Sequence, residues 1–494
     1  MSVEDSLKSK ERFVLIEAPA GCGKTHTACD YVRAAAAQLS EGQRVLVLAH
    51  TNAAVAEFRS RTHDIRSQIK IATFDSLSLS IIAPYVQALG LPYPLRMGTR
   101  ADQIPPIELA PRATDLLARC PDIAKMLARL HPIVVLDEHQ DANRSQHAMA
   151  MSLRDAGSLV RAFADRMQRI FVSETDFPWA EVVTDADVTD ELSHPHRWAD
   201  DLQLGNWILD ARARLAAGDP IDVTTAPRSV RMIVVPGDDI GNYGAGAPNT
   251  YFGPLRAVPA QGTAALLTAR VRHMRTLRTA SLGRAEYYEG SDLEHLYRTF
   301  DLCEQNAGKP KAIAEPLLDL IQDICSGLTA GNRGRIEKSL KDERIDYGRP
   351  HTVKPLLDAM LAVYELPNVF GAAKFCRLLL AQTPPFLRVL RPAALRIFSA
   401  LIPGPNDAYD QLQDAVVSYK LAIQLEDVVV ATVHRSKGHQ FEHVLISNVS
   451  GTHFPDDEEG RRLLYVALSR CRRSLTILVP AHGRSPLIAQ PRAD

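Results

Sequence analysis

Long apolar runs are missing from this sequence. Although 46% of its 494 residues are hydrophobic, no stretch approaches the ~20 consecutive apolar residues that cross a membrane as a helix. The N-terminal segment MSVEDSLKSKERF contains neither the apolar core of a signal peptide nor the Arg- and Ser-rich pattern of a transit peptide. We therefore expect a cytoplasmic protein that does not associate with membranes.

Closely spaced cysteines are missing as well. The seven cysteines are scattered and form no C-x-x-C pair, which argues against a zinc site and a disulfide framework and fits a reducing compartment. An excess of one charge is also lacking, because the net charge is -1. The chain as a whole therefore exerts no general attraction on nucleic acid, although a local basic channel is sufficient for binding.

The sequence does contain a regular alternation of two patterns. Apolar runs bounded by polar turns are typical of buried parallel strands, and segments with helical apolar spacing lie between most of them. This alternation predicts an α/β fold with helices on both faces of parallel sheets. The predicted strands cover residues 12–18, 44–50, 133–138, 159–165, 230–236, 262–268, 427–433, 443–449 and 474–480. The predicted helices include residues 26–39, 52–62, 141–156 and 460–472.

The predicted strands fall into two groups, which indicates two α/β domains. One group lies within residues 12–165 and the other within residues 230–480. Residues 77–130 and 276–424 lack strand character and are expected to form helical insertions. Residues 237–262 are rich in Gly and Pro and predict a long loop.

The segment VLIEAPAGCGKTHTACDYV places a glycine-containing loop between a predicted strand and a predicted helix. Backbone N–H groups of such a loop surround phosphates, and the helix N-terminus adds its dipole. Lys24 would reach the β- and γ-phosphates of ATP, and the Thr25 hydroxyl would ligate Mg²⁺. A chance Gly-Lys-Thr turn is the alternative. The predicted ATP-binding residues of the loop are Ala18, Pro19, Ala20, Gly21, Cys22, Gly23, Lys24, Thr25 and His26.

A cluster of acidic residues follows the apolar run that ends at Leu136, in the stretch LDEHQDANRSQ. Next to a phosphate loop, Asp137 is expected to hold Mg²⁺, and Glu138 is expected to act as the general base toward the attacking water. The alternative is a solvated helix N-terminus, where acidic side chains interact favourably with the helix dipole.

Eight segments, taken in order, resemble the motifs of the UvrD/Rep/PcrA-type helicases of superfamily 1. Among them, LDEHQDANRSQ is similar to D-E-x-Q-D-x-N, and TVHRSKGHQFEHVLI is similar to T-x-H-x-x-K-G-x-x-F. The segment EEGRRLLYVALSRCRRSLTIL is similar to E-E-x-R-R-L-x-Y-V-A-x-[TS]-R. The other five segments are residues 18–25, 49–61, 72–76, 162–171 and 192–198.

The resemblance implies a fold of two RecA-like parallel-sheet P-loop NTPase domains, each with a helical insertion. The first motor domain is expected at residues 1–76 and 131–190, with a small helical insertion at 77–130. The second is expected at residues 191–275 and 425–484, with a helical insertion at 276–424 and a tail at 485–494.

The resemblance also implies catalytic roles. Gln168 would sense the γ-phosphate, while Arg197 and Arg470 would act as arginine fingers that stabilise the charge spreading over the transferred phosphoryl group. Tyr465 lies in the last motif and is expected either near the cleft or in the core. The expected catalytic set is Lys24, Asp137, Glu138, Gln168, Arg197 and Arg470.

Several positions depart from the family pattern. Gln440 stands where the family has a Glu that contacts the ribose of the nucleotide, and it is kept as an ATP-binding residue because Gln also hydrogen-bonds a hydroxyl. The adenine-reading Gln of the family has no counterpart, because no Gln precedes Gln38. His50 replaces a Phe that often stacks on a base. The Trp that usually follows the Gln-x-Ile segment is missing in register, which leaves Phe171 and Trp179 as candidates.

The resemblance also implies nucleic-acid contacts, which are expected on loops opposite the nucleotide side. Short hydroxyl and amide side chains suit phosphate contacts that carry no sequence information. Phe74 is expected either as a base platform or as a core residue. The basic run 268–284 either lines the DNA path or forms a solvated helix face. The expected DNA-binding residues are His50, Thr51, Asn52, Thr73, Phe74, Thr432 and His434.

Three functions compete at this point. The first is an ATP-dependent helicase or translocase that moves 3′-to-5′ on single-stranded or 3′-tailed DNA, with Mg²⁺ as cofactor, as in DNA repair. The second is an ATP-hydrolysing sensor of DNA ends or DNA structure that activates a partner nuclease without unwinding, as in compact UvrD-like proteins of antiphage defence systems such as the Gabija type. The third is a structural ATPase without nucleic acid.

Overall fold

The computed structural model describes most of the chain. Its described residues are 2–50, 52–91, 104–172, 176–235, 262–270, 294–348, 352–389, 392–404 and 428–489, with single residues and pairs between 253 and 287 and between 408 and 416. The chain divides into two compact units: unit 1 is Met1–Glu286 with Asp427–Asp494, and unit 2 is Tyr287–Glu426. None of the described helices combines the length and the apolar character needed to cross a bilayer.

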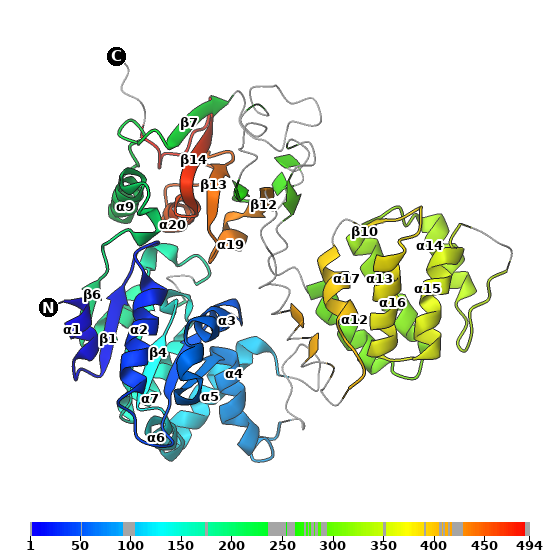
Figure 1. Ribbon diagram of the computed structural model, residues 1–494, viewed down its shortest axis with the longest axis horizontal. Helices are drawn as coiled ribbons and strands as arrows, with labels where there is room; N and C mark the ends of the chain where they lie inside the picture. The colour runs from blue at the N-terminus through cyan, green and yellow to red at the C-terminus, as the bar shows by residue number, and fades with distance from the viewer. Residues whose placement is uncertain are drawn as a thin grey trace. The chain divides into compact units, whose positions relative to one another are not determined.

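Unit 1 contains two parallel sheets (Figure 1). The first sheet has the strand order β3-β2-β4-β5-β1-β6, and each of its pairings is parallel. Because parallel strands all end at the same edge, the residues after these strands meet along one rim. The strands are β1 (Phe13–Glu17), β2 (Val45–Ala49), β3 (Ile69–Thr73), β4 (Ile133–Leu136), β5 (Leu159–Ala164) and β6 (Val188–Glu191).

Helices cover both faces of the first sheet, as its continuous apolar strands require. In β1, Val14 and Ile16 face one apolar core, and Phe13 and Leu15 face the other. The first core includes α1 (Val3–Lys8), α2 (Lys24–Ala36) and α3 (Asn52–Arg61). The second includes α4 (Phe74–Ile82), α5 (Pro106–Arg119), α6 (Pro121–Leu130), α7 (Arg144–Asp155) and α8 (Trp179–Asp185).

The second sheet has the strand order β7-β14-β13-β8-β12-β9, and the pairings from β7 to β12 are parallel. Its strands are β7 (Val230–Val235), β8 (Ala264–Thr268), β9 (Glu286–Tyr287), β12 (Val428–Thr432), β13 (Phe441–Ile446) and β14 (Cys471–Pro480). The helices of this part are α9 (Leu202–Ala217), α19 (Val433–Ser436) and α20 (Glu458–Leu468).

Unit 2 is helical in its described residues and has its own apolar core. A two-stranded antiparallel ribbon of β10 (Cys325–Ser326) and β11 (Arg388–Val389) is the exception. The helices are α12 (Glu294–Gln305), α13 (Pro310–Ile324), α14 (Ala330–Ser339), α15 (Lys354–Glu365), α16 (Val369–Ala381) and α17 (Pro392–Ser399).

The predicted fold class of two parallel-sheet, RecA-like α/β domains is confirmed, and each of the predicted strands overlaps an observed one. The two-residue strands β9, β10 and β11 were not predicted, and neither were β3 and β6 of the first sheet. Both are edge strands, and their polar residues interrupt the apolar run, as in the sequence VTDE of β6 with its alternately half-buried and exposed side chains. The predicted domain boundaries stay predictions. Most of the loop 237–262 and of the basic run 268–284 lies outside the described residues.

Arg161, in the middle of β5, anchors the N-terminal segment to the first sheet. Its side chain is completely buried. The guanidinium donates from Nε to the Leu7 carbonyl at 2.9 Å, from Nη2 to the Ser9 carbonyl at 2.6 Å and from Nη1 to the Glu11 carbonyl at 2.9 Å. Because α1 ends at Lys8, these carbonyls belong to the helix end and the turn that leads into β1.

Replacing Arg161 with Met should therefore destabilise unit 1 by about 3 kcal/mol, since several buried carbonyls lose their donor. The chain's three tryptophans, Trp179, Trp198 and Trp207, all lie in unit 1. Tryptophan fluorescence during urea unfolding would measure this change. Arg119→Met is the matched control, because Arg119 is exposed and, among the described residues, forms its ion pair with Asp115 on its own helix. An unfolding midpoint shared by both variants would contradict the anchoring role.

Candidate nucleotide site

The loop between β1 and α2 closes tightly through its own backbone. The Cys22 amide donates to the Pro19 carbonyl at 3.1 Å. Gly21 and Gly23 adopt positive φ angles of 78° and 84°, a conformation that glycine reaches at little cost. Because α2 begins at Lys24, the first N–H groups of the helix have no partner within it and face the loop. This is the geometry of a phosphate-binding loop.

The 3₁₀ turn η5 (His196–Trp198) packs directly against this loop. A Cβ atom on Gly21 would lie 2.7 Å from Trp198 Cζ3 and 2.8 Å from Arg197 Cβ, and one on Gly23 would lie 3.1 Å from His196 Cδ2. The Arg197 amide also donates to the Gly21 carbonyl at 3.0 Å. Glycine is therefore required at position 21 for both conformation and space.

The strand-end acids lie against the phosphate loop. Glu138, with a φ of 51°, is one of only two non-glycine residues with positive φ in the described part of the chain. This backbone conformation costs about 1 kcal/mol or more and is typically held in place at functional sites. The Glu138 carboxylate forms an ion pair with Lys24 and accepts from the Gln140 side-chain amide. Asp137 is buried beside them.

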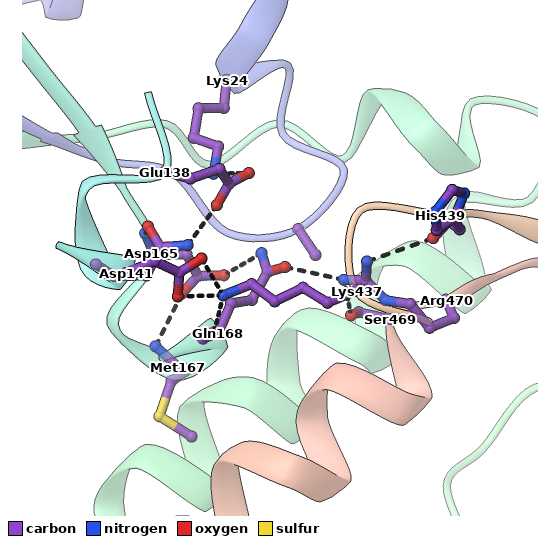
Figure 2. A network of polar contacts seen from close by, with 12 residues as sticks. Lys24, Glu138, Asp141, Asp165, Met167, Gln168, Lys437, His439, Ser469 and Arg470 are labelled. Atoms are coloured by element: carbon purple, nitrogen blue, oxygen red, sulfur yellow. Dashed lines mark hydrogen bonds and ion pairs between the residues drawn. The ribbon is translucent and has the colours of Figure 1, made fainter. Parts of the chain in front are cut away.

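Residues on α20 and in the turn between α20 and β14 complete the site from the side of the second sheet (Figure 2). Arg470 Nη2 donates to Gln168 Oε1 at 2.9 Å, and Gln168 Nε2 donates to Asp165 Oδ2 at 2.9 Å. The Tyr465 hydroxyl donates to the same Asp165 oxygen at 3.2 Å and accepts from the Ala20 amide of the phosphate loop at 2.9 Å. One hydrogen-bonded network thus joins the loop, β5 and α20.

Arg197 lies between the loop and the second sheet. Its Nη1 donates to the Ser469 carbonyl, next to Arg470, and its guanidinium carbon lies 5.4 Å from the centroid of the Trp198 ring. Its Nε atom is buried and has no hydrogen-bond partner among the described residues. Arg197 and Arg470 therefore bring two guanidinium groups close to the phosphate loop.

The charges of the site influence one another strongly. Burial acts to lower the pKa of Lys24, but the carboxylates of Glu138 and Asp137 outweigh it and raise the pKa. Burial also acts to raise the pKa of Glu138, yet Lys24 outweighs it and lowers the pKa, whereas for Asp137 burial prevails and raises the pKa. Burial lowers the pKa of Arg470, and burial with the neighbouring Arg470 charge lowers the pKa of Arg197 to about 9. A bound polyanion would relieve this concentration of positive charge.

The donor set also fits a Mg²⁺ ion. Asp137 Oδ1 is buried and accepts no hydrogen bond from any described residue, which is costly unless a cation or another donor satisfies it. Thr25 is the second residue of α2, immediately after Lys24, and offers a hydroxyl oxygen, a ligand type that Mg²⁺ accepts. Asp137 and Thr25 are the residues that could hold the ion.

The remaining residues predicted to bind the nucleotide differ in how far they are exposed to solvent. Ala18, Ala20 and Cys22 are buried, and burial raises the pKa of the Cys22 thiol to about 12. His26 is exposed and pairs with Asp30 on its own helix at 2.8 Å. Gln440 is exposed in the turn before β13. The structure thus brings the predicted catalytic residues together, while His26 and Gln440 point to solvent in it.

Lys437 and Arg212 are among the charged residues of the site that were not predicted, and the Asp165 carboxylate is another. Lys437 follows α19 and donates to both Asp141 oxygens, at 2.5 and 2.7 Å. Lys437 lies in the segment TVHRSKGHQFEHVLI, but nothing in that segment indicates which carboxylate pairs with its ammonium. Arg212 on α9 lies within 3.2 Å of Glu17, Asp165 and Glu191. No sequence signal marks Arg212, because its partners end three different strands.

The aromatic residues predicted to contact DNA are largely buried. His50 and Phe74 pack ring against ring, with centroids 4.8 Å apart, and Phe74 is 1% exposed. Burial lowers the pKa of His50 to about 3, so its ring is neutral. Trp179, the first residue of α8, is buried in the core, whereas Phe171 is 60% exposed.

The predicted hydroxyl contacts lie at equivalent places in the two sheets. Thr73 is the last residue of β3 and caps α4 by accepting from the Ser76 amide at 3.1 Å. Thr432 is the last residue of β12 and caps α19 by accepting from the Arg435 amide at 3.3 Å. His434 is half-buried on α19. Thr51 and the side chain of Asn52 lie outside the described residues.

Two domain families match this chain. Residues 2–97 match the AAA domain, and residues 427–478 match the UvrD-like helicase C-terminal domain. No curated protein matches the chain. Among solved structures, the crystal structure of Pif1 helicase from Candida albicans is similar with a TM-score of 0.42 and 13% sequence identity, covering 100% of this chain and 97% of that chain. A likeness of this size does not bear on function.

The two domain matches and the two parallel sheets define the class of protein. These matches imply an ATP-hydrolysing, helicase-like enzyme that acts on nucleic acid. Its N-terminal part contains the phosphate loop in a AAA domain, and its C-terminal part is a UvrD-like helicase domain.

The Tyr465 hydroxyl provides a test of the network. Tyr465→Phe removes the bridge between the Ala20 amide and Asp165, so we expect the KM for ATP to rise about tenfold, as for the loss of about 1.4 kcal/mol of binding. Steady-state ATP turnover measures this. Tyr364→Phe is the matched control, because its hydroxyl donates to a single carbonyl in unit 2. An equal KM in both variants would show that the bridge does not position the loop.

Proposed function

We propose that this enzyme is an ATP-dependent single-stranded DNA translocase or helicase that moves 3′-to-5′. The observation that carries the proposal is the network from the phosphate loop through Asp165 and Gln168 to Arg470 of the second part. Because both sides contribute groups to one site, hydrolysis depends on how the two sheets approach each other. Such a dependence is what converts ATP turnover into movement.

In this proposal Lys24 binds the β- and γ-phosphates and leaves its ion pair with Glu138 when ATP binds. Glu138 then accepts a proton from the attacking water. Arg197 and Arg470 donate to the γ-phosphate, and Gln168 reports its presence to Asp165. Thr25 and Asp137 would hold Mg²⁺, which would neutralise phosphate charge.

The proposed DNA path runs where strands β3 and β12 end. Thr73 and Thr432 present backbone and hydroxyl groups there, at the starts of α4 and α19. Phe171 supports the proposal, because it is an exposed aromatic ring whose centroid lies 6.1 Å from that of His434. Stacking on such rings tolerates any base, which suits a translocating enzyme. In contrast, Phe74 is buried and is better explained as a core residue.

The first test is ATP turnover with and without single-stranded DNA. We expect stimulation of at least about tenfold, because correctly placed arginine fingers contribute about 10³–10⁵ to phosphoryl transfer. Lys24→Ala should lower stimulated turnover by about 100-fold or more while leaving tryptophan fluorescence unchanged. If neither DNA nor RNA stimulates the parent chain, the proposed function is wrong. An active, folded Lys24→Ala variant would refute the assignment of the phosphate loop.

The second test concerns movement. The proposal predicts ATP-dependent strand displacement from a duplex with a 3′ single-stranded tail and none from the same duplex with a 5′ tail. A fluorescently labelled displaced strand provides the measurement. Displacement from the 5′-tailed duplex alone would reverse the polarity. DNA-stimulated turnover without any displacement would instead favour the sensor that activates a partner nuclease, and the same assay repeated with RNA distinguishes the two nucleic acids.

A further inference from the structure

Lys437 crosses from the second sheet into the first-sheet side of the site (Figure 2). It stands just after α19, and its side chain is 9% exposed. Besides the two contacts with the Asp141 carboxylate, its ammonium donates to the Gln168 carbonyl at 2.6 Å. All three hydrogens of the ammonium can therefore be used on acceptors from η3 (His139–Asp141) and η4 (Arg166–Gln168), both of which follow strands of the first sheet.

The same ammonium also reaches the candidate DNA surface. It lies 5.0 Å from the centroid of the Phe171 ring, which is a cation–π distance. The Phe171 ring also lies near His434, with centroids 6.1 Å apart, and His434 belongs to α19 and stands three residues before Lys437. Phe171 is 60% exposed. The Lys437 ammonium is thus in contact with a ring on which, in the proposed function, a nucleobase stacks.

The same ammonium is also two contacts away from the Glu138 carboxylate. Asp141 and Gln140 are neighbours in the turn η3. The Gln140 side chain donates to Glu138 and accepts from the Asp165 amide at 3.0 Å. Moving Asp141 therefore moves the residue that orients the Glu138 carboxylate.

We propose that Lys437 is a positioning residue that transmits nucleic-acid contact at Phe171 and His434, through Asp141 and Gln140, to the orientation of Glu138. The inference rests on the proposed function and adds to it a named path between the two sites. Base stacking on Phe171 and contact with His434 shift α19, and the ammonium carries that shift to η3. The ion pair suits this task because it is nearly dehydrated, so its geometry is not loosened by water.

The readout is the ratio of ATP turnover with saturating single-stranded DNA to turnover without it. Lys437→Met keeps the length of the side chain and removes its charge, and we expect the ratio to fall about tenfold. Asp141→Asn should have a similar effect. The double variant should be no worse than either single one, because both substitutions break the same contact. Lys437→Arg retains a charged partner for the carboxylate and should recover most of the ratio.

A second readout separates positioning from direct DNA binding. A positioning role lowers kcat at saturating DNA and changes the half-saturating DNA concentration less than about threefold. If Lys437 instead bound a DNA phosphate directly, Lys437→Met would raise the half-saturating DNA concentration, and saturating DNA would restore kcat. Lys125→Met is the matched control: Lys125 pairs with Asp122 at 2.9 Å, but that pair is exposed on α6. It should leave both readouts unchanged.

The outcomes are distinct. If the parent chain is not stimulated by single-stranded DNA or RNA, the proposed function fails, and the coupling role fails with it. If the parent is stimulated and Lys437→Met keeps the ratio, only the coupling role is overturned. It is also overturned if Lys437→Met and Asp141→Asn both lose their native tryptophan fluorescence, since the pair would then serve stability.

Discussion

The organisation of the nucleotide site depends on one buried carboxylate. Asp165 is fully buried at the end of β5, and a buried carboxylate is tolerated only when charged and hydrogen-bonded partners surround it. Its oxygens accept from the Gln168 and Tyr465 side chains and from Arg212, and its amide donates to Gln140. Each partner comes from a different element, so satisfying this single charge brings the strand ends, α9 and α20 together.

The same electrostatic requirement explains how the two sheets share a site. Cations of the second part, Arg470 and Lys437, find their acceptors on the first sheet side, at Gln168 and Asp141. Because these contacts are short and shielded from water, each is stronger than a surface pair but tolerates little displacement. Small movements of the second sheet would therefore lengthen or break the hydrogen bonds that connect it to the phosphate-loop side of the site. Such sensitivity suits an enzyme in which the rate of hydrolysis depends on conformation.

Much of this arrangement could be predicted from the sequence. Continuous apolar strands and the glycine loop have local signals, because burial on both faces and phosphate binding each demand particular residues in consecutive positions. The edge strands β3 and β6 could not be predicted this way, since polar residues break their apolar runs. Arg212 and the partner of Lys437 could not be predicted either. Their roles depend on which strand ends meet in space, and only the folded topology determines that.

The close packing of Gly21 against Trp198 has a consequence for the history of this chain. No side chain fits at position 21 while an indole ring occupies position 198, because the nearest ring atom would be 2.7 Å from the new Cβ. Substitutions at positions 21 and 198 are therefore not independent of each other. A larger residue at position 21 would also meet Arg197 Cβ at 2.8 Å, so in related chains that keep this packing we expect glycine at position 21 together with a large ring at position 198, although 177 positions separate the two in sequence.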